Sequence, residues 1–124
     1  MAVHVGMDLH GDNVYVVIVD NRGSVVFKKK VGNDLDTILA VLKPYRRQTK
    51  KIAVESTFNW YWLVDGLMSA GYDVGLVNTS ALKYYEAKKH TNDESDATFL
   101  ADELRLGRLK FGHIYPKEER PVRD

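Results

Sequence analysis

The chain has 124 residues, a length that suits one compact domain, and 44% of them are hydrophobic, which is enough for a packed core. It has no cysteine, which excludes a disulfide framework and a thiolate metal site. The stretch before Asp8 is too short for a secretory signal, and no apolar run approaches the roughly 20 residues of a membrane-spanning helix. A cytoplasmic protein is expected, and the net charge of +1 alone does not indicate a partner.

The first third of the chain predicts three strands. Valine and isoleucine are frequent in residues 2–9 and 13–20. After a turn, residues 24–31 again have the composition of a strand. Short polar segments at 10–12 and 20–23 separate them. Strands joined by such short turns predict an antiparallel meander.

Helices and strands alternate after the meander. Asn33 or Asp34 can cap a helix whose apolar residues recur at helical spacing from Leu35 to Leu42, and Pro44 should end or bend it. The elements expected next are a strand over 51–55, a helix over 59–70 followed by Gly71, a strand over 72–78, a short helix from Thr79 or Ser80 to about Lys88, and a helix from Asp93 to Leu106 closed by Gly107. This order predicts an α/β fold with a mixed sheet and helices on both faces. It resembles the ribonuclease H-like fold, although sugar kinases and actin-like ATPases begin similarly.

Four carboxylates stand at positions that suit metal binding. Asp8 lies near the end of the first apolar strand and Glu55 ends the strand over 51–55, while Asp93 and Asp96 share one face at the start of a helix. Each one alone can be a helix cap or a solvated residue, because helix N-termini favour acids. Together they offer the oxygen ligands that suit one or two Mg²⁺ ions, which can stabilise the attacking and leaving oxygens of a phosphoryl transfer.

Basic residues form clusters that can follow phosphates, or that can simply be solvated helix ends and strand edges. One run is Lys28, Lys29 and Lys30. The residues expected to contact nucleic acid are Lys88, Lys89, Arg46, Arg47, Lys50 and Lys51. His10 can contact the metal shell or a scissile phosphate, but a turn residue is the expected role, since Mg²⁺ prefers oxygen to imidazole.

Three blocks of sequence make a family resemblance specific. They are VGMDLH at 5–10, VESTFNWYWL at 54–63 and TNDESDA at 91–97, and they occur in this order along nearly the whole chain. The chain resembles the N-terminal domain of the IS110-family transposases, which has a RuvC-like, ribonuclease H-type fold. The resemblance places the Asp-Glu-Asp-Asp tetrad of that family on Asp8, Glu55, Asp93 and Asp96.

This resemblance implies a transposase or recombinase that cleaves and exchanges DNA strands with Mg²⁺, for which Mn²⁺ can substitute. It further implies RNA-guided choice of DNA and assembly into dimers or tetramers. Residues 1–110 are then the RuvC-like domain, and 111–124 begin a connecting segment to a C-terminal domain that supplies a nucleophilic serine. No serine of this chain is expected to take that role, so the chain alone should not suffice for activity.

Three alternatives to this interpretation stay open. The chain can be a non-catalytic module for nucleic-acid binding and dimerisation, with structural acids. It can be a RuvC-like nuclease that acts alone. An actin-like ATPase needs glycine-rich phosphate loops, whereas the glycines here are scattered.

Overall fold

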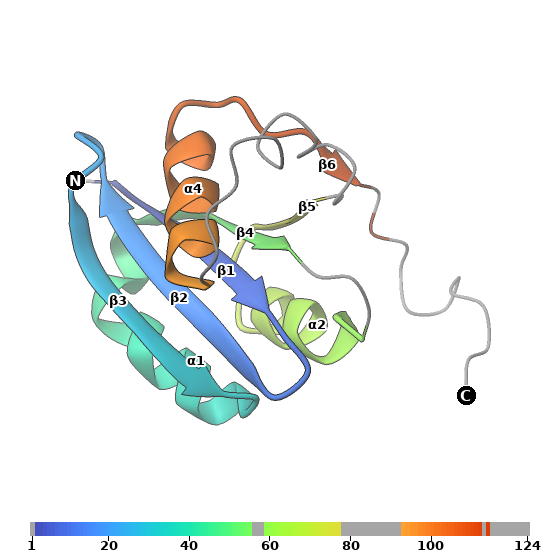
Figure 1. Ribbon diagram of the computed structural model, residues 1–124. Helices are drawn as coiled ribbons and strands as arrows, with labels where there is room; N and C mark the ends of the chain where they lie inside the picture. Colours follow the sequence, from blue (N-terminus) through green and yellow to red (C-terminus); the bar gives the residue numbers. More distant parts are fainter. Residues whose placement is uncertain (1, 56–58, 78–92, 113, 115–124) are drawn as a thin grey trace.

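The computed structural model of the protein describes residues 2–55, 59–77, 93–112 and 114 (Figure 1). Its elements, in chain order, are β1 (Val3–Leu9), β2 (Asn13–Asp20), β3 (Val25–Gly32), α1 (Leu35–Leu42), the 3-10 helix η1 (Lys43–Gln48), β4 (Thr49–Glu55), α2 (Tyr61–Ser69), β5 (Val74–Val77), α4 (Asp93–Arg105) and β6 (Phe111–Gly112). None of the described helices is long and apolar enough to cross a membrane.

The strands form one mixed sheet in the order β3-β2-β1-β4-β5-β6. β1, β2 and β3 pair antiparallel, which confirms the predicted meander. β1, β4 and β5 pair parallel at the centre, and β6 returns antiparallel on β5. Strand pairing therefore continues to Gly112, although a two-residue strand in a polar tail gives no periodic signal from which it could be predicted.

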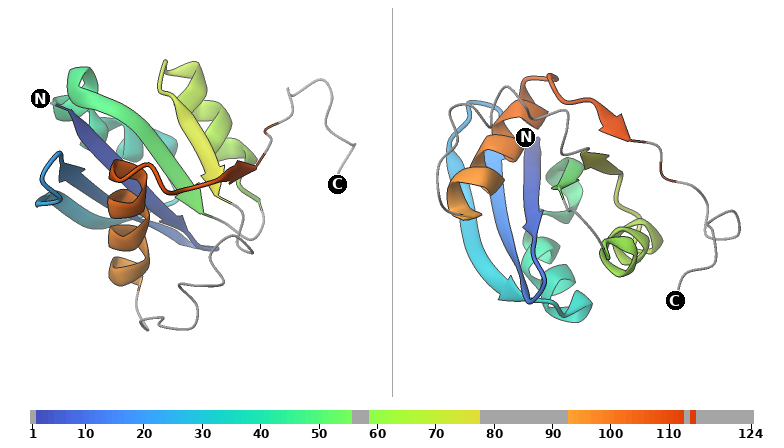
Figure 2. Two further views of the ribbon diagram at one scale, coloured as in Figure 1. Left: turned by 90° about the horizontal axis from the view of Figure 1, so that it is seen from above. Right: turned by 45° about the vertical axis from the view of Figure 1, so that its right-hand side comes forward.

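Helices cover both faces of this sheet, as the sequence predicted (Figure 2). On one face, the side chains of α1 and α2 pack with alternate residues of β1 such as Val5 and Met7 in the main core. On the other face, α4 lies across β1, β2 and β4. Because side chains alternate along a strand, the residues between those core positions, including Gly6 and Asp8, face α4.

α4 lies unusually close to β1. A Cβ atom added to Gly6 would overlap the carbonyl oxygen of Ala97 and lie 2.6 Å from the backbone nitrogen of Ala101. Ala97 and Ala101 are themselves fully buried. Glycine on the strand and two alanines on the helix thus let the two backbones approach, which fixes where α4 begins relative to the strand ends.

Most predicted boundaries agree with the structure to within two residues. The α-helix ends at Leu42 and Pro44 lies in the 3-10 helix that follows, because proline cannot donate the next helical hydrogen bond. Asp34 is the N-cap residue of α1, but its carboxylate accepts a 2.6 Å hydrogen bond from the Thr37 hydroxyl rather than from the backbone. The predicted short helix from Thr79 or Ser80 to about Lys88 lies outside the described residues.

Candidate active site

Asp8 and Glu55 lie side by side at the same edge of the sheet. They are paired residues at the C-terminal ends of β1 and β4, two neighbouring parallel strands. Their side chains are on the face that α4 covers, and their carboxyl groups share a hydrogen bond. Asp8 is 2% exposed and is the one buried charged residue among those the structure describes. The fold therefore brings these two predicted site residues together.

The surroundings of Asp8 change its acidity. Burial, together with the hydrogen bond and the charge of Glu55, raises the pKa of Asp8 from 3.8 to about 8, while the contact with His10 acts in the opposite direction. At neutral pH Asp8 therefore holds a proton, and the carboxyl pair carries one negative charge fewer than its two acids suggest. A cation bound between the two oxygens would replace that proton.

His10 contacts the same carboxyl group from the β1–β2 turn. Its Nε2 atom lies 3.0 Å from Oδ2 of Asp8, and its backbone nitrogen donates a 2.8 Å hydrogen bond to the carbonyl of Asn13. The turn position agrees with the prediction, but the contact with Asp8 was missed. The signal was available, because two residues separated by one along an extended chain lie on the same side.

The first turn of α4 lies at the same edge of the sheet (Figure 1). Asp93 is the first residue of the helix, and its side chain is outside the described set. Asp96 is half-buried. Within the described residues, no group of three or more acidic, histidine or cysteine side chains is assembled to hold a metal. The structure thus joins Asp8 to Glu55 and does not join Asp96 to them in such a group.

The predicted phosphate-contact residues of η1 and β4 lie away from this pair. Lys50 and Lys51 are near the start of β4 and Glu55 ends it, so Lys51 and Glu55 are about 13 Å apart along the strand. The Lys51 ammonium is 4.5 Å from the centre of the Phe111 ring and 3.5 Å from Asp73. These residues of β4 thus belong to the opposite end of the sheet.

The two arginines of η1 are similarly remote, since η1 directly precedes β4. Arg46 stacks over the ring of Tyr72, with its guanidinium carbon 4.6 Å from the ring centre, and Arg47 is exposed. Lys88 and Lys89 lie outside the described residues. In the described part of the chain the contacts of Asp8 are with Glu55 and His10, and the four described residues of this set are not among them.

The donor atoms at the carboxyl pair fit a hard divalent cation. Mg²⁺ takes oxygen ligands and is commonly bound by one or two carboxylates, with the remaining positions filled by water and substrate phosphates. Asp8 and Glu55 supply two such carboxylates, and neither cysteine nor an assembled histidine cluster offers a softer site in the described chain. The pair therefore meets the chemical requirement for Mg²⁺, and for Mn²⁺, which accepts the same ligands.

Comparisons with known proteins agree with this geometry. A family model described as a transposase, DEDD_Tnp_IS110, matches residues 5–121. The solved structure of T. thermophilus RuvC in complex with Holliday junction substrate is similar at a TM-score of 0.66 and 15% identity, over 90% of this chain and 99% of that one. The ethanolamine utilization protein EutJ from Carboxydothermus hydrogenoformans has a TM-score of 0.49 and 14% identity, over 73% of this chain and 41% of its own. No curated protein matches. The RuvC-like fold predicted from the sequence is confirmed.

Proposed function

The chain belongs to the IS110 family of DEDD transposases, and we propose that the edge of the sheet at Asp8 and Glu55 cleaves DNA phosphodiesters with a bound divalent metal. The observation that carries the proposal is the carboxyl pair of Asp8 and Glu55. Two acids held together at adjacent strand ends cost free energy when both are charged, and either a shared proton or a bound cation removes that cost. The pair thus supports a metal site at this edge of the sheet.

Asp93 and Asp96 are the proposed further ligands, and the helix register supports them. One turn after Asp93 comes Ala97, which lies over Gly6, and one turn after Asp96 comes Leu100, which packs with Ala53. α4 begins at the edge where β1 ends. Positions 93 and 96 lie one helical turn, about 5.4 Å, before the residues that pack over Gly6 and Ala53. Asp8 and Glu55 lie two strand residues, about 6.6 Å, beyond Gly6 and Ala53 in the same direction, so the two pairs of acids come close to each other.

The residues of the site have separate roles in this proposal. Asp8 and Glu55 would hold the metal once their shared proton is released to solvent, and His10 orients the Asp8 carboxylate through its 3.0 Å contact. The metal, when bound, supplies positive charge that stabilises the oxygens of the phosphodiester as they exchange. The helix dipole of α4 adds positive potential at its N-terminus, where a phosphate would approach.

The partners follow from the family and from the neighbouring structure. T. thermophilus RuvC was solved with a Holliday junction, and DNA is the proposed substrate of this chain as well. A guide RNA, Mn²⁺ as a substitute metal and assembly into dimers or tetramers are proposed from the family resemblance. A separate serine-bearing domain beyond this chain is proposed to complete the activity.

One observation favours a second candidate function. Within the described residues, two acids rather than three or four converge, and the metal-free pair is already joined by a hydrogen bond. That arrangement also suits a nucleic-acid-binding module whose acids are structural. The two candidates differ in whether the chain binds a divalent metal at this edge.

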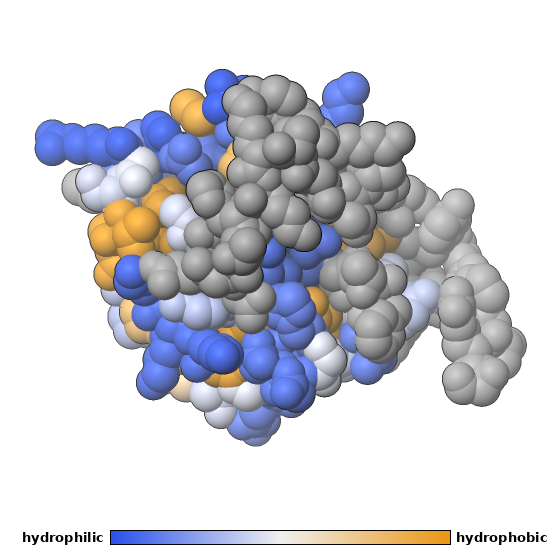
Figure 3. Space-filling view, in the orientation of Figure 1, coloured by the Kyte–Doolittle hydropathy of each residue, from blue (hydrophilic) through white to orange (hydrophobic). Residues whose placement is uncertain are grey.

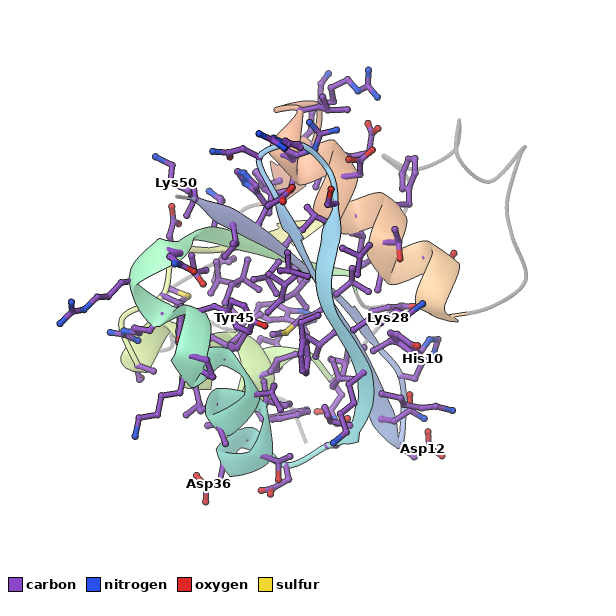
Figure 4. The ribbon with its side chains drawn as sticks, turned by 90° about the vertical axis from the view of Figure 1, so that its left-hand side faces the viewer. His10, Asp12, Lys28, Asp36, Tyr45 and Lys50 are labelled. Carbon is purple, nitrogen blue, oxygen red and sulfur yellow. The ribbon has the colours of Figure 1, made fainter. Side chains whose placement is uncertain are left out.

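Calorimetric titration with Mg²⁺ and with Mn²⁺ separates the candidates. We expect binding by the chain at pH 8 and its loss in the Asp8→Asn and Glu55→Gln variants, because each removes one charged ligand. Asp36→Asn is the matched control, since Asp36 is an exposed acid on α1, away from the site (Figure 4). Equal binding by Asp8→Asn and the unmodified chain would exclude the proposed metal site.

A further inference from the structure

β3 is an edge strand that carries three successive exposed lysines: Lys28, Lys29 and Lys30. Residues paired across antiparallel strands project from the same face. Lys28 pairs with Val17, which packs against α4, and Lys29 pairs with Val16, which packs in the core on the opposite face. Lys28 and Lys30 therefore face the α4 side of the sheet, and Lys29 faces the other side.

The lysine at position 30 is aligned with the carboxyl pair. Lys30 pairs with Tyr15, Tyr15 pairs with Asp8 and Asp8 pairs with Glu55, so one row of residues crosses four strands. Adjacent strands are about 4.8 Å apart, which places the backbone of Lys30 about 10 Å from that of Asp8. Figure 4 shows Lys28 with His10 on the side of the sheet where α4 begins.

We propose that Lys28 and Lys30, the β3 lysine pair, bind the phosphate backbone of the DNA strand that enters the carboxylate site. This inference rests on the proposed function, because it assigns the track along which the substrate reaches Asp8 and Glu55. A separation of about 10 Å corresponds to roughly three nucleotides at 3.4 Å of rise per nucleotide. The pair would therefore hold phosphates a few nucleotides from the one that reacts.

The surface around the β3 lysine pair is polar. In Figure 3, which shows the α4 face, hydrophilic residues predominate over the lower part of the molecule, where β1 and β3 end. Phosphate contacts from lysine supply most of the sequence-independent affinity for DNA, because each contact releases condensed counterions. Two lysines in consecutive rows on one face can follow a strand, whereas a third on the opposite face cannot.

Edge strands also carry lysine for another reason. Charged side chains on an edge keep it from pairing with the sheet of another molecule. That role does not depend on which face the lysine occupies, so replacing Lys29 would then have the same effect as replacing Lys28 or Lys30. The difference between the faces is therefore what the test must measure.

The test is the salt dependence of DNA binding by the full chain. A short fluorescein-labelled DNA duplex is titrated with protein in EDTA at several KCl concentrations, and fluorescence anisotropy gives the dissociation constants. We expect Lys28→Ala and Lys30→Ala each to lower the slope of log affinity against log salt by about 0.9, the value for one lost phosphate contact. Lys29→Ala removes the same charge from the same strand and should leave the slope almost unchanged.

Arginine variants control for folding and charge. Lys28→Arg and Lys30→Arg keep the positive charge and should keep the slope. Equal effects of all three alanine variants, no effect of any of them, or no DNA binding by the unmodified chain would overturn the proposal. Losses confined to an RNA duplex of the same sequence would assign the lysines to RNA and would overturn it too. The lysine variants retain both carboxyl groups, so metal calorimetry reports failure of the proposed function independently.

Discussion

Replacing Asp8 by asparagine should make the metal-free protein more stable in alkaline solution. Asparagine has nearly the shape of the protonated aspartic acid and can still donate a hydrogen bond to Glu55. In the folded state below the pKa of Asp8 the two side chains are therefore nearly equivalent, but the unfolded state of the unmodified chain is already stabilised by ionisation of Asp8 above about pH 4. Above the pKa of Asp8 in the folded state, the unmodified chain must hold two negative charges together in a site where Asp8 is 2% exposed, and the variant need not.

The size of the effect follows from the pKa of Asp8, which rises from 3.8 to about 8 on folding. Because the folded state binds this proton more tightly than the unfolded state, the stability that the proton contributes is fully present below about pH 4 and is lost as pH rises to about 8. The slope is at most about 1.4 kcal/mol per pH unit. The total has a ceiling on the order of 5 kcal/mol, since Asp8 and Glu55 share one proton.

Urea denaturation in EDTA between pH 5 and pH 9 measures this difference. The free energy of unfolding of Asp8→Asn should already exceed that of the unmodified chain at pH 5, and the difference should grow up to about pH 8. Adding Mg²⁺ at pH 8 should restore stability to the unmodified chain and leave the variant unchanged. A constant difference across the pH range, or a variant that is less stable at pH 9, would refute the reasoning.

Two further predictions concern packing contacts of the sheet. Gly6→Ala should lower the free energy of unfolding by roughly 1–3 kcal/mol in urea, because its Cβ meets backbone atoms of α4, whereas Gly32→Ala, with no atom within 4 Å of its Cβ, should change it little. Equal effects of the two substitutions would contradict the close approach of α4 to β1. A double-mutant cycle of Lys51→Met and Phe111→Leu should give a coupling energy of about 0.5–1 kcal/mol from the ammonium over the ring. Zero coupling would show that this contact does not hold β6 to the sheet.

The acids of the strand ends were predictable from sequence because strand ends are a local property. A run of apolar residues that stops at a carboxylate identifies both Asp8 and Glu55, and parallel pairing then brings them to one edge. The fold class was predictable for a similar reason, since turn residues and the hydrophobic periodicity of strands and helices are local properties of the sequence. The contact between His10 and Asp8 was missed although the alternation of side chains along the chain contains it.

Long-range packing was not predictable in the same way. Nothing near Gly6 in the sequence indicates that Ala97 and Ala101 will cover it, yet this contact sets where α4 begins and how its acids approach the strands. The raised pKa of Asp8 likewise depends on burial by distant elements. Charge clusters at η1 and β4 looked suited to phosphate, but the topology places Lys51 at the far end of the strand from Glu55.

The most direct test of the account is a crystal structure of the chain soaked in Mn²⁺ at pH 8, with the metal located by its anomalous scattering. We predict a peak bound by carboxylate oxygens of both Asp8 and Glu55, beside the first turn of α4, with Asp93 and Asp96 completing the ligand set. A structure without a peak there, in which Asp8 and Glu55 remain hydrogen-bonded to each other, would contradict the claim that this edge of the sheet is a metal-dependent active site.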